Sequence, residues 1–367
     1  MRLLYLYPEE WTGRRAREVH TLSTCVALAQ AGLDVTLVTA GGRRELQRHL
    51  REIAGRDQEP GLELVTLRRG IGPIRSAWIF RGNFQSWLGK QKEFEAAFVI
   101  HLKAAEMLRQ LEMPYLYEAH EVFAETARRN WAQQEKLHEL EKRVLEDATW
   151  RVATSKALAS ALRAHFVLPD DFAIVPNAGM PPLPQSIGGP GGPFVYCGSL
   201  ADWKGLDLVV QASAAERVPL KIVGGTAEEW KAFGQHVDTA HVKWEPRVEL
   251  AKLPEVFAGA RAGVISTQTG TPSGRYSCPM KLFDYARCGL PVISSALPSL
   301  QSLNVGSWCL QVEKPTREAW ADALRDFVFR PVQAETARAW AGVHTWKQRG
   351  ESLMRVLLQL PRPGRHH

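Results

Sequence analysis

Residues 277–294 read SCPMKLFDYARCGLPVIS, a short helical pattern that runs directly into an apolar strand. Pro279 suits the first helical position, where its missing N–H is not needed, and Gly289 is placed to close the helix in a left-handed conformation. A capped helix followed at once by Pro-Val-Ile is one unit of a chain in which helices wrap a parallel sheet. The stretch therefore predicts an α/β protein.

The same helix carries a lysine and a carboxylate on one face. Lys281 and Asp284 are three residues apart, so both side chains project from one side near the helix N-terminus. A helix N-terminus attracts phosphate, and Lys281 adds a mobile positive charge. We therefore expect Pro279, Met280 and Lys281 to surround a diphosphate, with Asp284 accepting hydrogen bonds from sugar hydroxyls. The alternative is a surface helix with ordinary solvated charges.

Short β-rich runs alternate with helical patterns along most of the chain, which predicts two similar α/β units. Strands are expected at residues 2–7, 34–39, 62–67, 97–100, 115–117, 151–154, 173–175, 194–197, 220–223, 242–244, 263–266, 291–294 and 308–312. Residues 177–193 are too rich in proline and glycine to form a packed element and are interpreted as a hinge. The predicted domains are 1–176 and 194–340, followed by a C-terminal helical segment, 341–367.

Composition narrows the class of protein. Of 367 residues, 45% are hydrophobic and 23% charged, and no apolar run approaches the roughly 20 residues that cross a bilayer. The N-terminus lacks the length of a signal peptide, so a cytoplasmic location is expected. Five cysteines without a zinc spacing predict reduced thiols. The net charge of +7 favours anionic partners, but no nucleic-acid motif occurs and the basic residues are spread over both halves.

The 277–294 stretch resembles the donor-binding motif of GT-B glycosyltransferases, especially the retaining family-4, or group 1, enzymes of bacterial envelope and polysaccharide synthesis. Their motif reads Ser-Pro-x-Lys-x-x-Glu before a Gly-x-Pro-Val-Ile strand. Here Cys278 and Asp284 replace the serine and the glutamate, and Tyr276 stands where a first glutamate is common. The resemblance implies two Rossmann-like doubly wound domains facing across a cleft, with the last helix crossing back onto the first domain. Residues 343–349, VHTWKQR, look like the His-Ser-Trp segment of that helix.

Two further segments match the family in the first domain. Residues 117–121, YEAHE, resemble its Tyr-Asp/Glu-x-His-Asp/Glu segment, which implies that His120 contacts the transferred sugar or the reacting centre. A structural hydrogen-bonding histidine is the alternative. The loop after the first strand contains Gly13, where relatives place a glycine-bearing loop touching donor phosphate and acceptor, and three arginines follow it: Arg14, Arg15 and Arg17. Ligands bind at the carboxyl ends of strands in doubly wound sheets, so this loop should border the site.

The second domain opens with residues 195–205, VYCGSLADWKG, where relatives use an arginine and a lysine to neutralise the leaving diphosphate. Gly198 and Lys204 are retained, Ser199 replaces the arginine, and Arg275 is the suggested substitute. The chain has no Asp-x-Asp triplet, which implies a metal-independent enzyme without a bound cofactor. His120, Lys204 and Lys281 are the expected catalytic residues, and a UDP-sugar is the expected donor because UDP is common among relatives.

Residues 71–92 interleave aromatic and basic side chains and suggest either an anionic membrane surface or an amphipathic helix packed on the core. The resemblance implies a retaining hexosyltransferase that acts on a saccharide or lipid-linked acceptor hydroxyl. The alternatives are a catalytically weak GT-B scaffold that binds nucleotide or a partner, motivated by Ser199 and Tyr276, and a nucleotide-sugar 2-epimerase.

Overall fold

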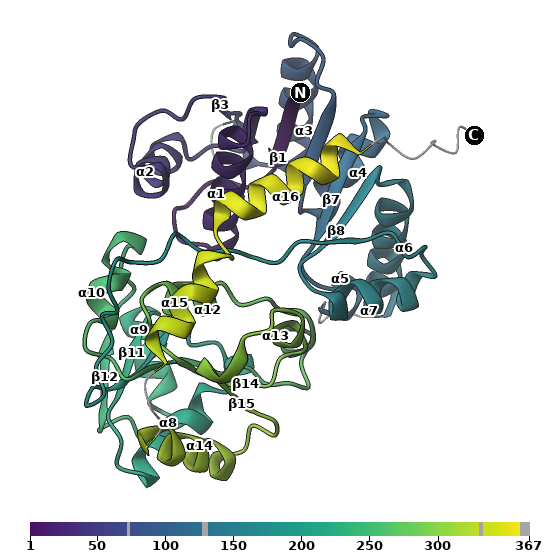
Figure 1. The fold of residues 1–367 in the computed structure, drawn as a ribbon. Coiled ribbons are helices and arrows are strands. Elements are labelled where there is room, and N and C mark those ends of the chain that lie inside the picture. Colours follow the sequence, from purple (N-terminus) through teal and green to yellow (C-terminus); the bar gives the residue numbers. More distant parts are fainter. Residues whose placement is uncertain (72–73, 127–130, 330–332, 360–367) are drawn as a thin grey trace. The chain divides into compact units, whose positions relative to one another are not determined.

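The computed structural model describes residues 1–71, 74–126, 131–329 and 333–359, and the chain divides into two compact units (Figure 1). Unit 1 contains residues 1–176 together with the segment from Trp346 onward. Unit 2 contains Asn177–Thr345. Each unit is built around its own parallel sheet with helices on both faces.

Among its described residues, the main sheet of unit 1 has seven parallel strands in the order β3-β2-β1-β6-β7-β8-β9. The strands are β1 (Arg2–Tyr7), β2 (Asp34–Thr39), β3 (Leu62–Thr66), β6 (Ala96–Val99), β7 (Tyr115–Ala119), β8 (Trp150–Ala153) and β9 (Ala173–Ile174). The helices are α1 (Ala16–Gln30), α2 (Arg43–Ala54), α3 (Ala77–Leu88), α4 (Leu102–Gln110), α5 (Phe123–Thr126), α6 (Trp131–Asp147), α7 (Lys156–Phe166) and α16 (Trp346–Leu358).

The sheet of unit 2 has six parallel strands among its described residues, in the order β12-β11-β10-β13-β14-β15. The strands are β10 (Phe194–Cys197), β11 (Leu220–Val223), β12 (Val242–Glu245), β13 (Ala262–Ile265), β14 (Val292–Ser295) and β15 (Cys309–Val312). The helices are α8 (Leu206–Ala215), α9 (Ala227–Phe233), α10 (Leu253–Phe257), α11 (Pro272–Tyr276), α12 (Met280–Arg287), α13 (Pro298–Ser302), α14 (Arg317–Phe329) and α15 (Ala334–Gly342), with 3-10 turns at Asp202–Lys204, Leu250–Lys252 and Gly306–Trp308.

These two Rossmann-like sheets confirm the predicted fold class, and every predicted strand is present to within two residues. The strands were recognisable because parallel strands are buried on both faces and read as continuous apolar runs. Leu3, Leu4 and Leu6 of β1, for example, are all fully buried. The five cysteines are free thiols, as expected, and four of them are buried.

Helix α16 packs on α1 within unit 1, although more than 300 residues separate them in the sequence (Figure 1). Leu353, Val356 and Leu357 are buried in the unit 1 core. Gly350 permits the close approach, because a Cβ there would stand 2.5 Å from the carbonyl oxygen of Ala27. The last helix thus belongs to the first unit.

The described residues after Thr316 form three helices, of which α14 and α15 belong to unit 2. At α12, one local detail differs from the sequence expectations and one agrees with them. Pro279 is the N-cap rather than the first helical residue, because its backbone is extended (ψ 119°) and its carbonyl receives the N–H of Leu282. Gly289 does follow the helix in the left-handed conformation, with φ of 72°.

Residues 177–193 form no helix, as expected, but backbone hydrogen bonds tie them to the rest of unit 2. The backbone N–H groups of Leu183 and Ile187 donate to the carbonyls of Arg287 and Cys288 at the end of α12. Arg287 in turn donates to the carbonyl of Pro181. The hinge role of this segment stays a prediction.

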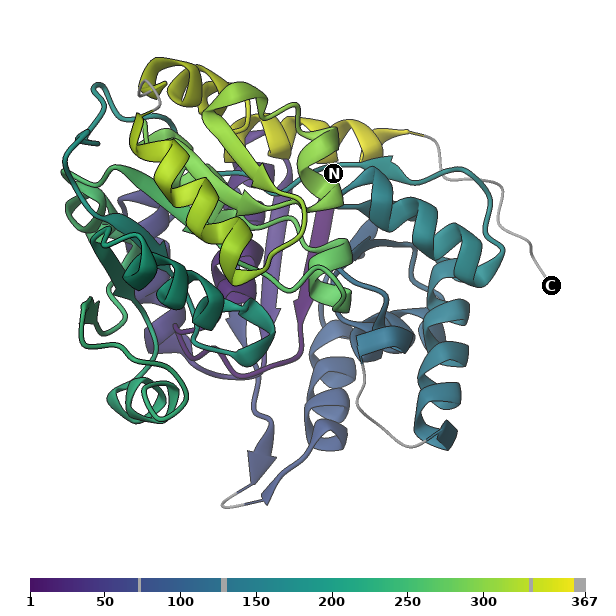
Figure 2. The same cartoon turned by 90° about the horizontal axis from the view of Figure 1, so that it is seen from below.

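An antiparallel ribbon, β4 (Gly70–Ile71) and β5 (Ile74–Arg75), precedes α3 and projects from unit 1 beside it (Figure 2). The sequence did not predict this ribbon because its strands are two residues long. Within the described parts of the chain, no helix combines the length and apolar character that crossing a bilayer requires.

Candidate functional site

Each sheet has one point at which the strand order reverses direction, and ligands of open α/β sheets bind outside the carboxyl ends of the strands there. In unit 2 the reversal lies between β10 and β13, and in unit 1 it lies between β1 and β6. The residues expected to bind the donor diphosphate follow β10 or begin α12, which comes after β13. The side chains at these two points are therefore the candidates for the functional site.

In unit 2, the side chain of Lys281 lies against the turn after β10. Its Nζ stands 4.1 Å from the centre of the Tyr196 ring. A Cβ at Gly198 would stand only 2.6 Å from the same Nζ, so glycine leaves the space that the lysine occupies. The structure thus brings together Gly198 and Lys281, two residues that the sequence analysis assigned to the donor site.

Lys204 contributes a second cation near this turn. It ends the 3-10 turn Asp202–Lys204, and its Nζ stacks 3.7 Å from the centre of the Trp203 ring. Burial and, to a smaller extent, the charge of Lys281 lower the pKa of Lys204 to about 6. Burial also lowers the pKa of Lys281, to about 8, although Cys197 and Asp284 oppose the shift. Among the described residues neither lysine forms an ion pair, so an anion that stabilises both ammonium forms has to come from a ligand.

Asp284 follows Lys281 by one turn of α12, as expected, and is partly buried. Burial raises its pKa to about 6, against the opposing charges of Arg287 and Lys281. Asp284 is therefore close to titrating at neutral pH, which suits a group that exchanges hydrogen bonds with sugar hydroxyls. This role stays a prediction.

The residues around the two lysines show how the site is framed. Ser199 is exposed, and its carbonyl accepts a 2.6 Å hydrogen bond from Tyr196 Oη. Pro279 and Met280 stand at the start of α12, and the carbonyl of Cys278 before them is held by Asn177 at 2.6 Å. Arg275, the suggested substitute for the missing arginine, lies on the neighbouring Tyr276 ring, 5.1 Å from its centre, and is exposed. Its contact with a donor stays a prediction.

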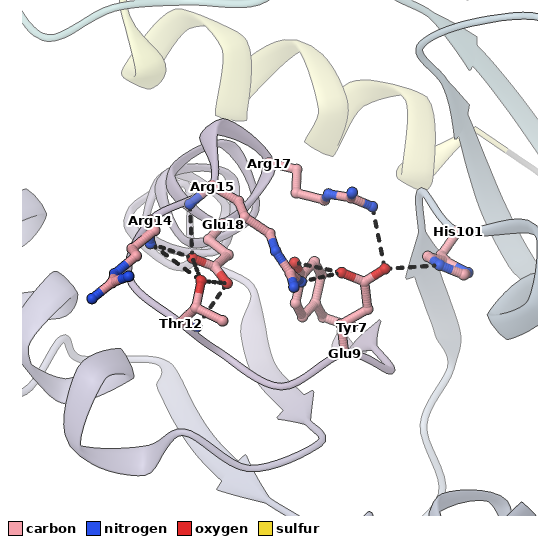
Figure 3. A network of polar contacts seen from close by, with 8 residues as sticks. All are labelled: Tyr7, Glu9, Thr12, Arg14, Arg15, Arg17, Glu18 and His101. Atoms are coloured by element: carbon pink, nitrogen blue, oxygen red, sulfur yellow. Dashed lines mark hydrogen bonds and ion pairs between the residues drawn. The ribbon is translucent and has the colours of Figure 1, made fainter. Parts of the chain in front are cut away.

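In unit 1, a cluster of charged residues occupies the reversal point (Figure 3). Glu9 follows β1 and His101 follows β6, and the Nε2 atom of His101 lies 3.3 Å from Glu9 Oε1. Arg15 donates to Glu9 Oε2 at 2.5 Å, and Arg17 donates to Oε1 at 3.2 Å. The hydrogen bond with His101 and the charges of Arg17 and Arg15 lower the pKa of Glu9 to about 2. We call Glu9, Arg15, Arg17 and His101 the Glu9 cluster.

The loop that contains Gly13 is folded around a second carboxylate. Glu18 is fully buried, and its oxygens accept the backbone N–H groups of Thr12, Arg14 and Arg15 at 2.7 to 3.1 Å. Gly13 itself is buried with φ of 71°. The N–H groups on either side of Gly13 are thus already satisfied by an internal anion (Figure 3). Because Glu18 already accepts these N–H groups, they are not available to bind phosphate. The expected contact of Gly13 with phosphate stays a prediction.

His120 lies directly after β7, with its side chain 31% exposed and its Nε2 2.8 Å from Glu118 Oε1. The same oxygen lies 2.6 Å from Nη2 of Arg349 and 3.2 Å from Nε2 of His20. Burial alone would raise the pKa of Glu118, but Arg349 and the histidines hold it well below its usual range. The carboxylate therefore stays ionised and fixes the imidazole of His120 at the carboxyl end of the sheet.

His20, Glu118 and His120 also form a set that could ligate a metal, since their ligand atoms lie within 4.8 Å of one another. Two imidazoles and a carboxylate suit zinc in type. The guanidinium of Arg349, however, hydrogen-bonds to the carboxylate oxygen on which both histidines converge. A divalent ion there would sit beside a buried positive charge, so the donor set fits an ion-pair network better than a metal.

The segment 71–92 combines features of both sequence interpretations. Phe80 and Phe84 of α3 are buried, which an amphipathic helix on the core requires. Trp78 of the same helix is 80% exposed. Residues 72–73 lie outside the described residues.

Comparisons with known families and structures agree with this arrangement. The family model described as Glycosyltransferase Family 4 matches residues 18–178, and the model described as Glycosyl transferases group 1 matches residues 192–328. The chain belongs to the family 4, or group 1, glycosyltransferases. The first model ends at residue 178 and the second begins at residue 192, near the two ends of the proline-rich segment. The first therefore covers most of unit 1 and the second most of unit 2.

The glycosyltransferase shares its fold with solved GT-B structures. A sucrose-phosphate synthase (tll1590) from Thermosynechococcus elongatus is 18% identical and has a TM-score of 0.73, with 98% of each chain covered. Anabaena Alr3699/HepE in complex with UDP-glucose is 13% identical, with a TM-score of 0.72 over 97% of this chain and 99% of that one. The lipopolysaccharide glycosyltransferase WaaG is 15% identical, with a TM-score of 0.66 over 97% and 100%. None of the curated proteins matches the chain.

Several residues at these sites were not predicted as site residues. His20 lies inside α1, and Arg349 lies in the last helix, so neither follows a strand directly. Glu9 and His101 do follow strands, but they are 92 positions apart and only the adjacency of β1 and β6 joins them. A polar residue directly after each predicted strand is the sequence signal that would have found this pair.

Proposed function

We propose that this glycosyltransferase is a retaining, metal-independent hexosyltransferase that transfers a sugar from a UDP-sugar to the hydroxyl of a saccharide or lipid-linked acceptor. The observation that carries the proposal is that Lys204 and Lys281, at the reversal point of unit 2, form no ion pair with any residue that the structure describes. Partly buried cations with lowered pKa values and no anionic partner suit a ligand that brings the negative charge. A diphosphate leaving group supplies that charge.

In the proposed mechanism each residue has one task. Lys204, Lys281 and the N-terminus of α12, formed by Pro279 and Met280, stabilise the charge that develops on the diphosphate as the bond to the sugar breaks. Gly198 and Ser199 allow the diphosphate to approach the backbone. Asp284 holds sugar hydroxyls in unit 2, and His120, oriented by Glu118, contacts the transferred sugar from unit 1.

In this scheme the catalytic residues act without a resident metal or cofactor; they are Lys204, Lys281 and His120. The nucleotide-sugar is a substrate. Anabaena HepE has been solved with UDP-glucose and with UDP, which supports a UDP-sugar as the donor class to test first. Acceptor and configuration come from the family resemblance. The enzyme is proposed to be cytoplasmic and to meet lipid-linked acceptors at an anionic membrane surface. The exposed Trp78 of α3 is the proposed contact point.

A thermal-shift screen of UDP, GDP, ADP and dTDP without metal tests the donor site. A ligand that binds only the folded state raises the melting temperature according to its concentration over its dissociation constant. We expect UDP to stabilise the native protein and to lose that effect in Lys281→Ala. Lys103→Ala is the matched control, because Lys103 is exposed on α4 of unit 1. No shift with any nucleotide would contradict the proposal.

A catalytically weak scaffold is the second candidate, favoured by one observation. Ser199 is an exposed serine where relatives carry a cation, and Tyr276 is a buried tyrosine where many carry a glutamate. NMR detection of the hydrolysis of UDP-glucose to α-glucose distinguishes the transferase from the scaffold. Turnover with retained configuration supports the transferase, whereas UDP binding without turnover supports the scaffold.

A further inference from the structure

The Glu9 cluster is a second cationic site, separate from the lysines of unit 2. Glu9 follows β1 and His101 follows β6, which are neighbours in the sheet at its reversal point. Open α/β sheets bind ligands at this location. The lysines of unit 2 already provide for the diphosphate of the donor, so a second set of cations in unit 1 has another anion to serve.

The cations of the cluster are pre-arranged around one carboxylate. Glu9 is shared by two guanidiniums and an imidazole, and the carboxylates of Glu18 and Glu121 act on Arg15 and Arg17 from outside the cluster. Arg15 and Arg17 each direct one Nη atom at Glu9, and their side chains remain 42% and 53% exposed. The planar guanidinium keeps further N–H donors for a bidentate contact with a phosphate or carboxylate.

The loop itself directs recognition to these side chains. The backbone N–H groups that would otherwise bind an anion are taken by Glu18. Arg14, from the same loop, extends to the opposite side from Glu9, whereas Arg15 and Arg17 converge on it (Figure 3). An anion at this edge of the sheet therefore meets the guanidiniums of Arg15 and Arg17.

We propose that Arg15 and Arg17 bind an anionic group, a phosphate or a carboxylate, carried by the acceptor saccharide. This inference rests on the proposed function, because it assumes that unit 1 receives the acceptor. Glu9 holds both guanidiniums in position, and through its low pKa it remains ionised across the physiological range. The acceptor is then a sugar phosphate or a uronic acid in chemical class, and a neutral sugar of the same ring binds weakly.

Three probes that share the same sugar ring test this proposal: glucose, glucose 6-phosphate and glucuronate. Inorganic phosphate is a fourth probe. Binding is measured by calorimetry in saturating UDP, which occupies the lysines of unit 2 and prevents them from capturing the anion. We expect at least one anionic probe to bind and glucose to show no measurable heat. Preference for glucose 6-phosphate over glucuronate identifies phosphate as the anion, and the reverse identifies a carboxylate.

Arg15→Gln and Arg17→Gln each remove a charged donor while keeping a similar length. Each should weaken anion binding about 10- to 100-fold, since a hydrogen bond to a charged group contributes that much to an equilibrium constant. Arg14→Gln is the control in the same loop and should leave binding unchanged. Equal binding of glucose and its anionic analogues, no binding of any anion, or an effect of Arg14→Gln as large as the others would overturn the inference.

The two proposals fail in different ways. If UDP does not stabilise the chain, the donor proposal fails whatever the sugars do. If UDP binds the native protein and its binding is lost in Lys281→Ala, but anion binding does not depend on Arg15 and Arg17, only the acceptor inference fails.

Discussion

Donor binding should take up protons, because the two lysines of unit 2 are partly neutral in the free protein. With pKa values of about 6 for Lys204 and about 8 for Lys281, the first is mostly neutral at pH 7 and the second mostly charged. A bound diphosphate stabilises both charged forms and raises both pKa values. Binding at pH 7 therefore adds about 0.9 proton to Lys204 and about 0.1 to Lys281, or about 1 in all.

The sign and size of the pH dependence follow from this uptake. A ligand that binds the protonated form binds more weakly as pH rises, with a slope equal to the protons taken up. Uptake should grow from about 0.5 at pH 6 to about 1.5 at pH 8, so the affinity should fall about 20-fold between pH 7 and pH 8. UDP-glucose is the right probe, since its diphosphate diester does not titrate near neutral pH, unlike that of UDP.

The assay is calorimetry of UDP-glucose in two buffers with different ionisation enthalpies, whose difference in heat gives the protons exchanged. Lys204→Met should reduce uptake at pH 7 from about 1 to about 0.1, because the remaining lysine is already charged. Lys103→Met should change nothing. A binding heat that does not depend on the buffer at pH 7 and pH 8 would refute the reasoning, as would normal uptake in Lys204→Met.

Three other perturbations have definite outcomes. Gly198→Ala should weaken UDP-glucose binding in calorimetry because its Cβ would stand 2.6 Å from the lysine ammonium, whereas Gly191→Ala, with open space around it, should not. Arg349→Met should lower the free energy of urea unfolding by about 3–5 kcal/mol, because it leaves a buried carboxylate without its cation, and the exposed Arg355→Met should change it by less than about 0.5 kcal/mol. Trp78→Ser should reduce sedimentation with anionic liposomes at low salt, and an unchanged bound fraction would remove Trp78 as the membrane contact.

The strands could be predicted from the sequence because each strand is specified by residues that are neighbours in the chain. Runs such as Leu3 to Leu6 and Val292 to Ile293 are apolar on both faces, which a parallel strand between helix layers requires. The proposed donor residues Lys204 and Lys281 could be singled out for a related reason: each lies in a short segment whose strand, turn and helix follow one another directly. Pattern and position coincide in such segments.

The unit 1 network could not be predicted in this way, because its members meet only through the order of the strands. Arg349 reaches Glu118 over 231 positions, and nothing in the spacing of either residue specifies the pairing. The role of Glu18 was also hidden, since a buried carboxylate that accepts N–H groups from its own loop looks, in sequence, like an ordinary acid at a helix start. Both cases depend on tertiary contacts rather than on local pattern.

The two reversal points handle positive charge in opposite ways, and this difference bears on how the substrates bind. In unit 2 the lysines have no anionic partner among the described residues, and burial shifts their pKa values toward neutrality, so the proposed donor would complete the site electrostatically. In unit 1 Glu9 already pairs with Arg15 and Arg17, and arginine stays charged at any pH of interest. Binding at the Glu9 cluster should therefore depend on salt but little on pH, whereas donor binding depends on both, because only the lysines must gain protons to receive their ligand.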